Sequence, residues 1–343
     1  MIYTPKNMLV TGGAGFIASH FVRYYQEHHP EIFIVNLDKL TYAGSLNNLK
    51  NLRFPQQHHF VQGDILDSDL VLKLFKDFKV DTLVHFAAET HVDRSINSPE
   101  KFIQTNISGT FALLETCRKY WLQEQGFGQG DCRFHHISTD EVYGSLQKDE
   151  PAFTEFTPYR PNSPYSASKA SSDYLVRAYY ATYGLPVSIS NCSNNYGPLQ
   201  HREKFIPMVI QQCLTKQPIP VYGDGSNIRD WLYVDDHCSA IDAVIRRGRV
   251  GETYNIGGNN ELSNLAVISA ICDVLAKIKA STFNYNKLIT FVKDRPGHDW
   301  RYAINSRKIK EEINWQPKET FLSGIIKTLT KYCNTNPVFS PRE

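Results

Sequence analysis

Met8-Leu9-Val10-Thr11-Gly12-Gly13-Ala14-Gly15-Phe16-Ile17-Ala18 is the stretch of sequence that decides the fold. Its apolar run, residues 8–10, predicts a buried strand, and residues 16–28 predict a helix. Glycines in the turn between them let the backbone approach a pyrophosphate, and the first N–H groups of the helix can bind it. This order of strand, glycine-rich turn and helix is typical of dinucleotide-binding folds.

Short apolar runs recur along the first half of the chain and predict strands. They cover residues 8–10, 32–37, 60–61, 82–87, 134–137 and 187–190. Helices are predicted between several of them, at residues 16–28, 70–78, 102–120 and 165–183. Because buried strands that alternate with helices form parallel sheets covered on both faces, we expect an α/β fold with a Rossmann-type doubly wound parallel sheet.

The composition of the chain changes after residue 190. Residues 191–198 are too polar and too rich in turn formers to continue the strand before them, and shorter elements with many Pro, Gly and Asn follow. We expect residues 1–190 to form the dinucleotide-binding domain. Residues 191–330 should form mainly a smaller C-terminal substrate-binding region, with some segments returning to the first domain, and residues 331–343 a C-terminal tail.

Charge and cysteine content exclude several classes of partner. The 37 basic and 35 acidic residues give a net charge of +2, which offers no general attraction to nucleic acid or to an anionic membrane. No apolar segment reaches the roughly eighteen residues of a membrane span. Seven scattered cysteines without C-x-x-C spacing favour neither a disulfide framework nor a zinc site. We therefore expect a cytoplasmic protein that binds neither nucleic acid nor membrane.

Two histidine pairs, His58-His59 and His135-His136, raise the question of a metal site. Both pairs lie in or beside predicted strands, where neighbouring side chains point to opposite faces, and no set of acidic ligands accompanies them. We therefore expect no metal.

Acidic residues at the ends of the second and third strands point to a cofactor. Asp38 lies at the distance from the glycine turn at which a carboxylate binds the adenosine ribose hydroxyls, and it would repel a 2′-phosphate. This favours NAD, although the neighbouring Lys39 leaves NADP open. Asp64 would face the adenine, and Ala87 and Ala88 would let the dinucleotide lie close to the backbone. The alternative is a glycine turn and a capping aspartate that bind no cofactor.

The candidate catalytic groups lie in Ser138-Thr139-Asp140-Glu141 and in Tyr165-Ser166-Ala167-Ser168-Lys169. Tyr165 and Lys169 share one face of a predicted helix, so the ammonium can stabilise the phenolate and make Tyr165 a base near neutral pH. Simple alcohol oxidation needs no adjacent Asp-Glu pair, so a further step is implied. Each motif alone could be a pair of surface groups; their positions at a strand end and a helix start favour catalysis.

These motifs occur together in an order that resembles the extended short-chain dehydrogenase/reductases and, within them, the dTDP-glucose 4,6-dehydratase family, over roughly residues 7–305. The matching segments are residues 38–44, 85–95, 138–144, 165–169, 191–198 and 295–299. The chain departs from the family pattern at Ala18, where a third glycine is usual, and at Thr90, where serine is usual. It also has Trp300 and Asn305 where arginine and aspartate are expected.

The resemblance implies dehydration of dTDP-glucose with NAD. In that reaction Tyr165, helped by Lys169 and Thr139, takes the hydroxyl proton while carbon 4 is oxidised. Glu141 then removes the hydrogen of carbon 5, Asp140 protonates the leaving hydroxyl of carbon 6, and the hydride returns to carbon 6. The family is also expected to form a homodimer through the helices at residues 102–120 and 165–183.

The resemblance also assigns binding residues. The cofactor is expected to contact Gly12, Gly15, Phe16, Ile17, Asp38, Lys39, Leu40, Thr41, Asp64, Ile65, Phe86, Ala87, Ala88, Thr105, Tyr165, Lys169 and Asn195. The nucleotide sugar is expected to contact Thr90, Thr139, Asn194, Lys204, Phe205, Pro220, Val221, Tyr222, Arg229, Asn264, Asp294, Arg295, Pro296, Gly297 and His298.

Other hypotheses share part of this pattern. A nucleotide-sugar 4-epimerase would need the glycine turn, Tyr165 and Lys169 but has no use for Asp140 and Glu141. A 4,6-dehydratase for another nucleotide sugar would differ in few contacts to the base, and a sugar dehydrogenase would release NADH. A non-catalytic NAD-binding regulator would need neither the Tyr-Lys pair nor the carboxylates.

Overall fold

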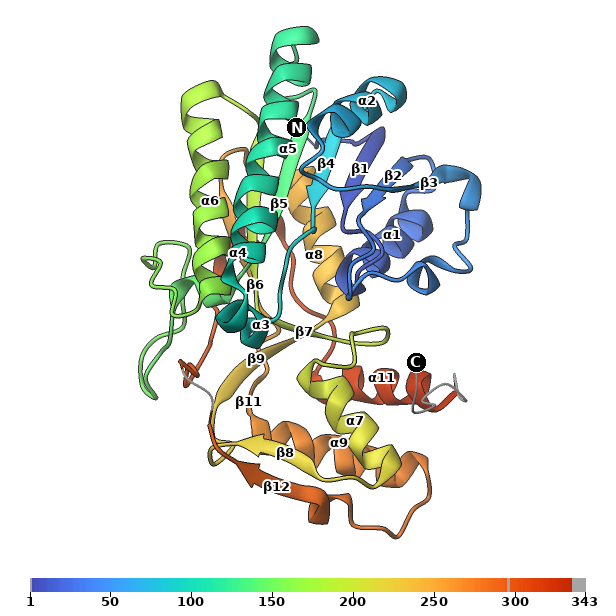
Figure 1. Cartoon of the computed structure of the whole chain (residues 1–343), viewed down its shortest axis with the longest axis vertical. Helices are drawn as coiled ribbons and strands as arrows, with labels where there is room; N and C mark the ends of the chain where they lie inside the picture. The colour runs from blue at the N-terminus through green and yellow to red at the C-terminus, as the bar shows by residue number, and fades with distance from the viewer. Residues whose placement is uncertain (1, 295–296, 335–343) are drawn as a thin grey trace.

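A seven-stranded sheet with the strand order β10-β6-β5-β4-β1-β2-β3 forms the centre of the larger part of the molecule, and all of its strand pairs are parallel (Figure 1). The computed structural model describes residues 2–294 and 297–334. The strands are β1 (Asn7–Thr11), β2 (Phe33–Asp38), β3 (His58–Gln62), β4 (Thr82–His85), β5 (Arg133–Thr139), β6 (Val187–Cys192) and β10 (Thr253–Ile256). The predicted doubly wound parallel sheet is confirmed.

Helices cover both faces of this sheet because neighbouring strand residues point to opposite sides. Leu9 packs in a core with residues of α2 (Ser68–Phe78), α5 (Gly109–Cys117) and α6 (Pro164–Tyr183). Met8 and Val10 pack in a second core with residues of α1 (Phe16–His28) and α8 (Val234–Arg247). Burial on both faces explains why β1 is continuously apolar from Met8 to Val10.

The predicted helix at residues 102–120 is part of a longer helical run. It begins with α4 (Pro99–Phe102), where proline occupies the first turn, and continues through a π-helical turn, η3 (Ile103–Ser108), into α5. A second π-helical segment, η4 (Arg118–Glu124), extends it. Helices α2 and α6 also begin earlier than predicted, since side chains of Asp67 and Ser163 cap their first N–H groups.

The prediction that residues 191–198 are not strand is wrong in two places. Strand β6 continues through Cys192, and residues 194–196 form β7 (Asn194–Tyr196), which pairs with β9 (Ile228–Tyr233). Asn191 is fully buried, and its side-chain amide compensates for the lost contact with water by donating to the Thr139 carbonyl oxygen at 3.3 Å and to the Tyr159 hydroxyl at 3.2 Å. Hydrogen bonds across the sheet thus allow a polar sequence to be buried as strand.

A smaller unit lies beyond the main sheet, below it in Figure 1. It contains one sheet of β7, β9 and β11 (Glu261–Ser263), another of β8 (Ile219–Tyr222) and β12 (Ile289–Val292), and the helices α7 (Phe205–Thr215), α9 (Asn264–Ile278) and α11 (Phe321–Asn334). Its own core includes Val209, Trp231, Ile271 and Leu329. Segments α8, β10 and α10 (Arg307–Ile313) return to the larger part, where they pack with one another.

The remaining short elements lie in the connections. They are α3 (Val92–Asn97), η1 (Leu46–Leu49), η2 (Pro55–Gln57), η5 (Asp140–Tyr143) and η6 (Tyr285–Leu288). Across residues 2–294 and 297–334, every helix falls short of the length or the apolar character that a membrane span requires.

Candidate active site

The carboxyl ends of β1, β4, β5 and β6 meet at one edge of the main sheet, as the parallel topology requires. The turn after β1, the segment after β4 and the carboxylates after β5 therefore come together although they are far apart in sequence. A Cβ atom on Gly12 would lie 2.8 Å from the Cα of Ala87, which measures how closely two of these segments approach.

The glycine turn after β1 presents backbone rather than side chains. Gly12 has φ +73°, a conformation that favours glycine, and Gly15 precedes α1 without any side chain capping the first N–H groups of the helix. Asp38 at the end of β2 accepts hydrogen bonds from the Ala14 N–H at 2.9 Å and the Leu40 N–H at 2.7 Å. The N–H groups at the start of α1, which no side chain caps, and the close backbone approach at Gly12 are features that a dinucleotide pyrophosphate needs.

The other predicted cofactor residues occupy the same edge or its flanks. Lys39 forms an ion pair with Asp64 at 2.6 Å, and the Ile65 side chain is buried against Gly109 of α5. Thr105 lies in the π-helical turn η3, and the Asn195 side-chain oxygen lies 2.9 Å from His237 Nδ1. Residues Phe16, Ile17, Thr41, Phe86 and Ala88 are in the turns and first helical residues around them.

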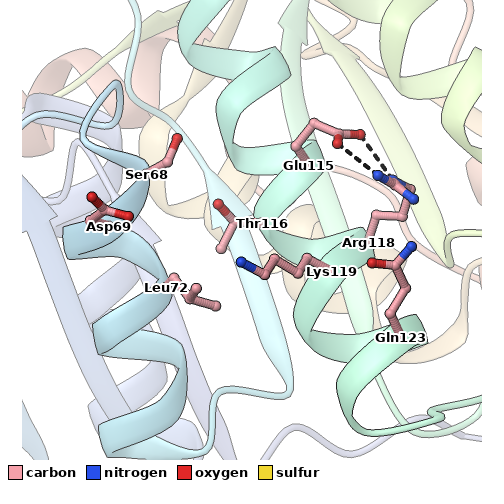
Figure 2. Close-up of a pocket in the computed structure, with 8 residues that line it drawn as sticks. All are labelled: Ser68, Asp69, Leu72, Glu115, Thr116, Arg118, Lys119 and Gln123. Atoms are coloured by element: carbon pink, nitrogen blue, oxygen red, sulfur yellow. Dashed lines mark hydrogen bonds and ion pairs between the residues drawn. The ribbon is translucent and has the colours of Figure 1, made fainter.

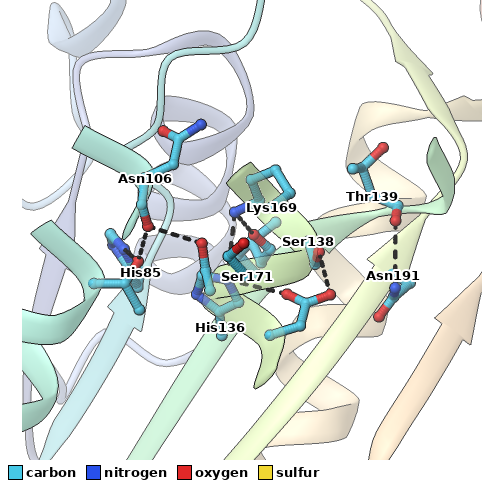
Figure 3. Close-up of polar contacts among 12 residues, drawn as sticks. His85, Asn106, His136, Ser138, Thr139, Lys169, Ser171 and Asn191 are labelled. Carbon is cyan, nitrogen blue, oxygen red and sulfur yellow. Dashed lines mark hydrogen bonds and ion pairs between the residues drawn. The ribbon is translucent and has the colours of Figure 1, made fainter. Parts of the chain in front are cut away.

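Tyr165 and Lys169 lie on the first turns of α6 and are both buried. Lys169 Nζ donates to the Ile137 carbonyl oxygen at 2.8 Å and lies 3.4 Å from His136 Nε2 (Figure 3). Burial lowers the pKa of Lys169 to about 8, against the opposing effect of the Asp173 charge. Burial, and then the charge of Glu141, raise the pKa of Tyr165 well above its usual value, although a hydrogen bond with Thr139 opposes this.

The pKa of Tyr165 is raised, whereas its helical spacing to Lys169 led us to expect a lowered pKa. Helical spacing places the two side chains on one face, but Lys169 directs its ammonium to the backbone and the imidazole of β5. The phenol is thus a weak acid in this arrangement, and it needs additional positive charge nearby to act as a base near neutral pH.

The two carboxylates directly follow β5 and differ in environment. Asp140 is 1% exposed, and its Oδ2 has no hydrogen-bond partner within the described residues. Burial, then the negative charges of Glu141 and Asp230, raise the pKa of Asp140 well above its usual value, and Arg229 opposes them. Glu141 is only half-buried. Burial therefore favours the protonated form of Asp140 beside a more accessible carboxylate, and an environment that separates two carboxyl groups in this way suits an acid and a base.

Thr139 joins this constellation through its hydroxyl. The hydroxyl accepts a hydrogen bond from the Glu141 N–H at 3.3 Å and lies 3.4 Å from Asp140 Oδ1. Because it also contacts the phenol of Tyr165, Thr139 connects the tyrosine to the two carboxylates. All five predicted catalytic residues are thus brought to one place.

The smaller unit contributes cationic and polar groups to the same edge. Arg229 of β9 is 6% exposed, donates to the Asp299 carbonyl oxygen at 2.9 Å and lies 4.2 Å from the centre of the Tyr302 ring. Its charge acts on Asp140, which places the two groups in one electrostatic environment. Lys204 Nζ donates to the Thr90 carbonyl oxygen at 2.9 Å, and the buried side-chain oxygen of Asn194 has no hydrogen-bond partner in the described part of the chain.

The remaining predicted sugar-nucleotide residues surround β8. Tyr222 is 41% exposed and its ring lies 6.2 Å from that of His298, whose Nδ1 is 2.7 Å from Asp294 Oδ1. The Val221 side chain, by contrast, is buried in the core of the smaller unit, so only its backbone can meet a ligand. Pro220 precedes Val221 on β8. Phe205 is the first residue of α7 and stacks on Trp231, and Asn264 is the first residue of α9. Gly297 has φ +64°. Arg295 and Pro296 lie outside the described residues.

Three buried residues of the site were missed by sequence reasoning. Asn106 in η3 binds both backbone groups of Glu89 and donates to the Ser168 hydroxyl at 2.8 Å, so it ties the segment after β4 to α6. His136 and Asp173 lie behind Lys169. Asp173 follows Lys169 by four residues on α6, and this spacing was a signal that could have found it.

The histidines of β5 have partners other than a metal. His135 lies 2.8 Å from the Ser188 hydroxyl and 3.1 Å from the Ser190 hydroxyl, both on β6. Over residues 2–294 and 297–334, no three His, Cys, Asp or Glu side chains are grouped as metal ligands.

A separate pocket lies between α2 and the helix that contains α5 (Figure 2). It is lined by Ser68, Asp69, Leu72, Glu115, Thr116, Arg118, Lys119 and Gln123. Glu115 and Arg118 form an ion pair with each other at 2.8 Å. The pocket contains none of the predicted site residues, so the candidate active site is the strand edge and not this surface pocket.

The parallel sheet, its glycine turn and the buried Tyr-x-x-x-Lys pair place the chain among the extended short-chain dehydrogenase/reductases. Residues 9–328 match the family model described as GDP-mannose 4,6 dehydratase, and the chain belongs to that family. Within it, the chain is 53% identical to the dTDP-glucose 4,6-dehydratase of Salmonella typhimurium (strain LT2) in an alignment 333 positions long that covers 95% of this chain and 92% of the relative.

Two solved structures are similar to the whole chain. The dTDP-glucose 4,6-dehydratase of Bacillus anthracis, crystallised in complex with NAD, is 46% identical with a TM-score of 0.84, and the match covers 96% of this chain and 97% of that one. The dTDP-glucose 4,6-dehydratase DesIV of Streptomyces venezuelae, with NAD bound, is 43% identical with a TM-score of 0.86 and the same coverage.

Because burial and neighbouring charges raise its pKa, Asp140 should be protonated at pH 7. Infrared difference spectra of the wild-type protein against Asp140→Asn are expected to contain the C=O stretch of a protonated carboxylic acid. Asp149→Asn, which changes an exposed aspartate, serves as the control and should leave that band in place. A spectrum in which Asp140→Asn removes only carboxylate bands would contradict the assignment.

Proposed function

We propose that the protein is an NAD-dependent enzyme that dehydrates dTDP-glucose to dTDP-4-keto-6-deoxyglucose. The single observation that carries this function is the pair of adjacent carboxyl groups beside Tyr165 and Lys169, one of them buried with a raised pKa and the other more accessible. Oxidation alone would not need them. The whole-length similarity to dTDP-glucose 4,6-dehydratases supports the same reaction.

The residues of the strand edge fit NAD. The turn from Gly12 to Gly15 would hold the pyrophosphate, since any side chain at Gly12 would meet the backbone of Ala87. Asp38 would bind the adenosine ribose, and Lys169 the other ribose. When bound, NAD accepts the hydride of carbon 4 and later supplies it to carbon 6.

The proton of the carbon 4 hydroxyl is taken by Tyr165. Only the phenolate can accept this proton, and burial favours the phenol, so positive charge must stabilise the phenolate before the transfer. Lys169 is the buried cation on the same face of α6, and Thr139 supplies a hydrogen bond to the phenol. These groups support oxidation at carbon 4.

A ketone at carbon 4 makes the hydrogen on carbon 5 acidic, because the resulting carbanion is delocalised as an enolate. Glu141, the more accessible carboxylate, removes this proton. Asp140, which burial keeps protonated, donates to the departing hydroxyl of carbon 6, and water is lost. Each such positioned acid or base typically contributes about 10²–10⁴-fold to the rate.

The nucleotide sugar is held from the smaller unit. Its diphosphate requires cations or N–H donors, and Lys204 and Arg229 lie at the junction between the two parts of the molecule. The side-chain oxygen of half-buried Asn194, which has no hydrogen-bond partner among the described residues, is an acceptor for a sugar hydroxyl or a base N–H. Tyr222, which is 41% exposed and packs with its ring 6.2 Å from that of His298, offers an aromatic surface suited to the base.

A homodimer and a cytoplasmic location are further parts of the proposal. On α6 the exposed residues include Ala167, Tyr174, Ala178 and Ala181, and Arg177 is the charged residue among them. Ile103 and Phe111 are 54% and 49% exposed on the adjacent helical run. Small and apolar residues on two neighbouring helices suit packing against the same helices of a second copy.

The proposed cytoplasmic location rests on the cysteines. All seven are free thiols, which suits a reducing compartment.

Incubation with dTDP-glucose that carries deuterium at carbon 4 tests the function. The expected product is lighter by one water and retains the deuterium, now in the new methyl group, because the hydride is returned within the site. UDP-glucose and GDP-mannose, assayed in parallel by mass spectrometry, test the choice of nucleotide. A product of unchanged mass would indicate an epimerase, accumulating NADH a dehydrogenase, and loss of deuterium to the medium would contradict the mechanism.

Substitution of the base residues should separate the two half-reactions. Tyr165→Phe should slow the single-turnover reduction of bound NAD by about 10²–10⁴-fold, since it removes the base for the hydroxyl proton. Glu141→Gln should still reduce NAD but slow the exchange of the carbon 5 hydrogen with solvent by a similar factor. NADH is followed by absorbance and exchange by mass spectrometry in D₂O. Normal exchange in Glu141→Gln would remove that residue from its role.

The dimer is tested by adding charge to the outward face of α6. Ala178→Glu should shift the sedimentation coefficient from that of a dimer to that of a monomer, because a carboxylate would be buried without a partner at the helix contact. Phe156→Glu changes a side chain that is 90% exposed and lies on neither helix, so it serves as the control. A wild-type protein that sediments only as a monomer would refute the proposal.

A further inference from the structure

Lys169 is surrounded by buried groups from four elements of the larger part of the fold. His85 faces it from β4, His136 from β5, Cys192 from β6, and Asp173 from its own helix α6. Burial keeps the pKa of both histidines well below the usual value, so they are neutral, and burial raises that of Cys192. Asp173 is therefore the one group among these four that can place a negative charge near the ammonium.

Asp173 is held rigidly where it lies. Its Oδ2 accepts hydrogen bonds from the Ser138 hydroxyl at 2.8 Å and from the Tyr159 hydroxyl at 3.0 Å, and it is fully buried. Ser138 directly precedes Thr139, so this carboxylate is anchored to the strand that carries the catalytic carboxyl groups. Tyr165, Lys169 and Asp173 follow one another at intervals of four residues along α6 and thus share a face of the helix.

His136 stands between the two charged groups. Its Nε2 lies 3.4 Å from Lys169 Nζ and 3.3 Å from Asp173 Oδ1 (Figure 3). Depending on the tautomer, this nitrogen accepts from the ammonium or donates to the carboxylate oxygen, which has no other hydrogen-bond partner among the described residues. The neutral ring can make only one of these two bonds at a time, so the carboxylate acts on the ammonium mainly through its charge.

The burial of Lys169 creates the need for such a partner. An ammonium removed from water loses solvation, and in this site the loss brings its pKa down to about 8 even with Asp173 present. The Asp173 carboxyl, with a pKa raised to about 6 by its own burial, is still ionised at neutral pH. Between these two values both groups are charged, and each stabilises the charge of the other.

From this geometry we infer that Asp173 is a positioning residue for the hydride-transfer step, whose negative charge beside the ammonium keeps Lys169 protonated. Asp173 itself does not touch the sugar or the cofactor. The inference rests on the proposed function, because it assigns Asp173 a task in the oxidation at carbon 4.

The test is the pH profile of NAD reduction in Asp173→Asn, measured in single turnovers of the holoenzyme with dTDP-glucose. In the wild type the rate should fall as pH rises through the pKa of Lys169, about 8. Loss of the carboxylate should move this alkaline limb down by about one to three pH units, so that the rate at pH 8 is at least about fivefold lower while the loss at pH 6 is smaller. A merely structural role would lower the rate equally at all pH values.

Tyr159→Phe is the matched control, because it removes one hydrogen bond to Asp173 but leaves the charge in place. Its alkaline limb should coincide with that of the wild type. Asp173→Ser provides a second uncharged variant if the amide variant does not fold, as judged by circular dichroism and thermal unfolding. An alkaline limb that stays in place in a folded, uncharged variant would overturn the inference. Absence of both NADH and dehydrated product in the wild type would instead overturn the proposed function.

Discussion

Removal of ionisable side chains from water at the carboxyl edge of the sheet is the constraint on which the rest of the site depends. Asp140, Tyr165, Lys169 and Asp173 are all buried there, and burial is the largest cause of the pKa shift of each. Desolvation favours the neutral form, so it makes Asp140 an acid and makes Lys169 depend on a buried anion. One physical effect therefore produces both the chemistry of the site and its need for a supporting network.

The fold supplies this environment through the meeting of strand ends. Parallel strands β1, β4, β5 and β6 end at one edge, and the smaller unit covers that edge with β7 and β9. Side chains such as Asn106 and Asn191 then cross between elements and satisfy backbone groups that would otherwise be buried without partners. The site is thus a polar interior held between two hydrophobic cores, and its geometry depends on both.

Much of this architecture could be predicted from local sequence. The apolar runs and the glycine turn predicted the strands, helix α1 and the Rossmann-type sheet, because both periodicity and turn chemistry are local properties. Boundaries were less predictable. The π-helical turns around α5 leave no distinct local pattern, and the polar strand β7 contradicts the usual composition of buried strands, since its stability comes from pairing with β9.

The sequence by itself determined which chemical groups are present, their order, and the helical spacing that aligns Tyr165 with Lys169. Only the tertiary structure decided their protonation and orientation. The spacing predicted an acidic phenol, whereas the folded chain buries it beside Glu141 and turns the ammonium toward β5. It also brought His136 and Asp173 behind Lys169 and buried the side chain of Val221. The reason is that desolvation and Coulomb interactions depend on distance in space, which a linear sequence does not contain.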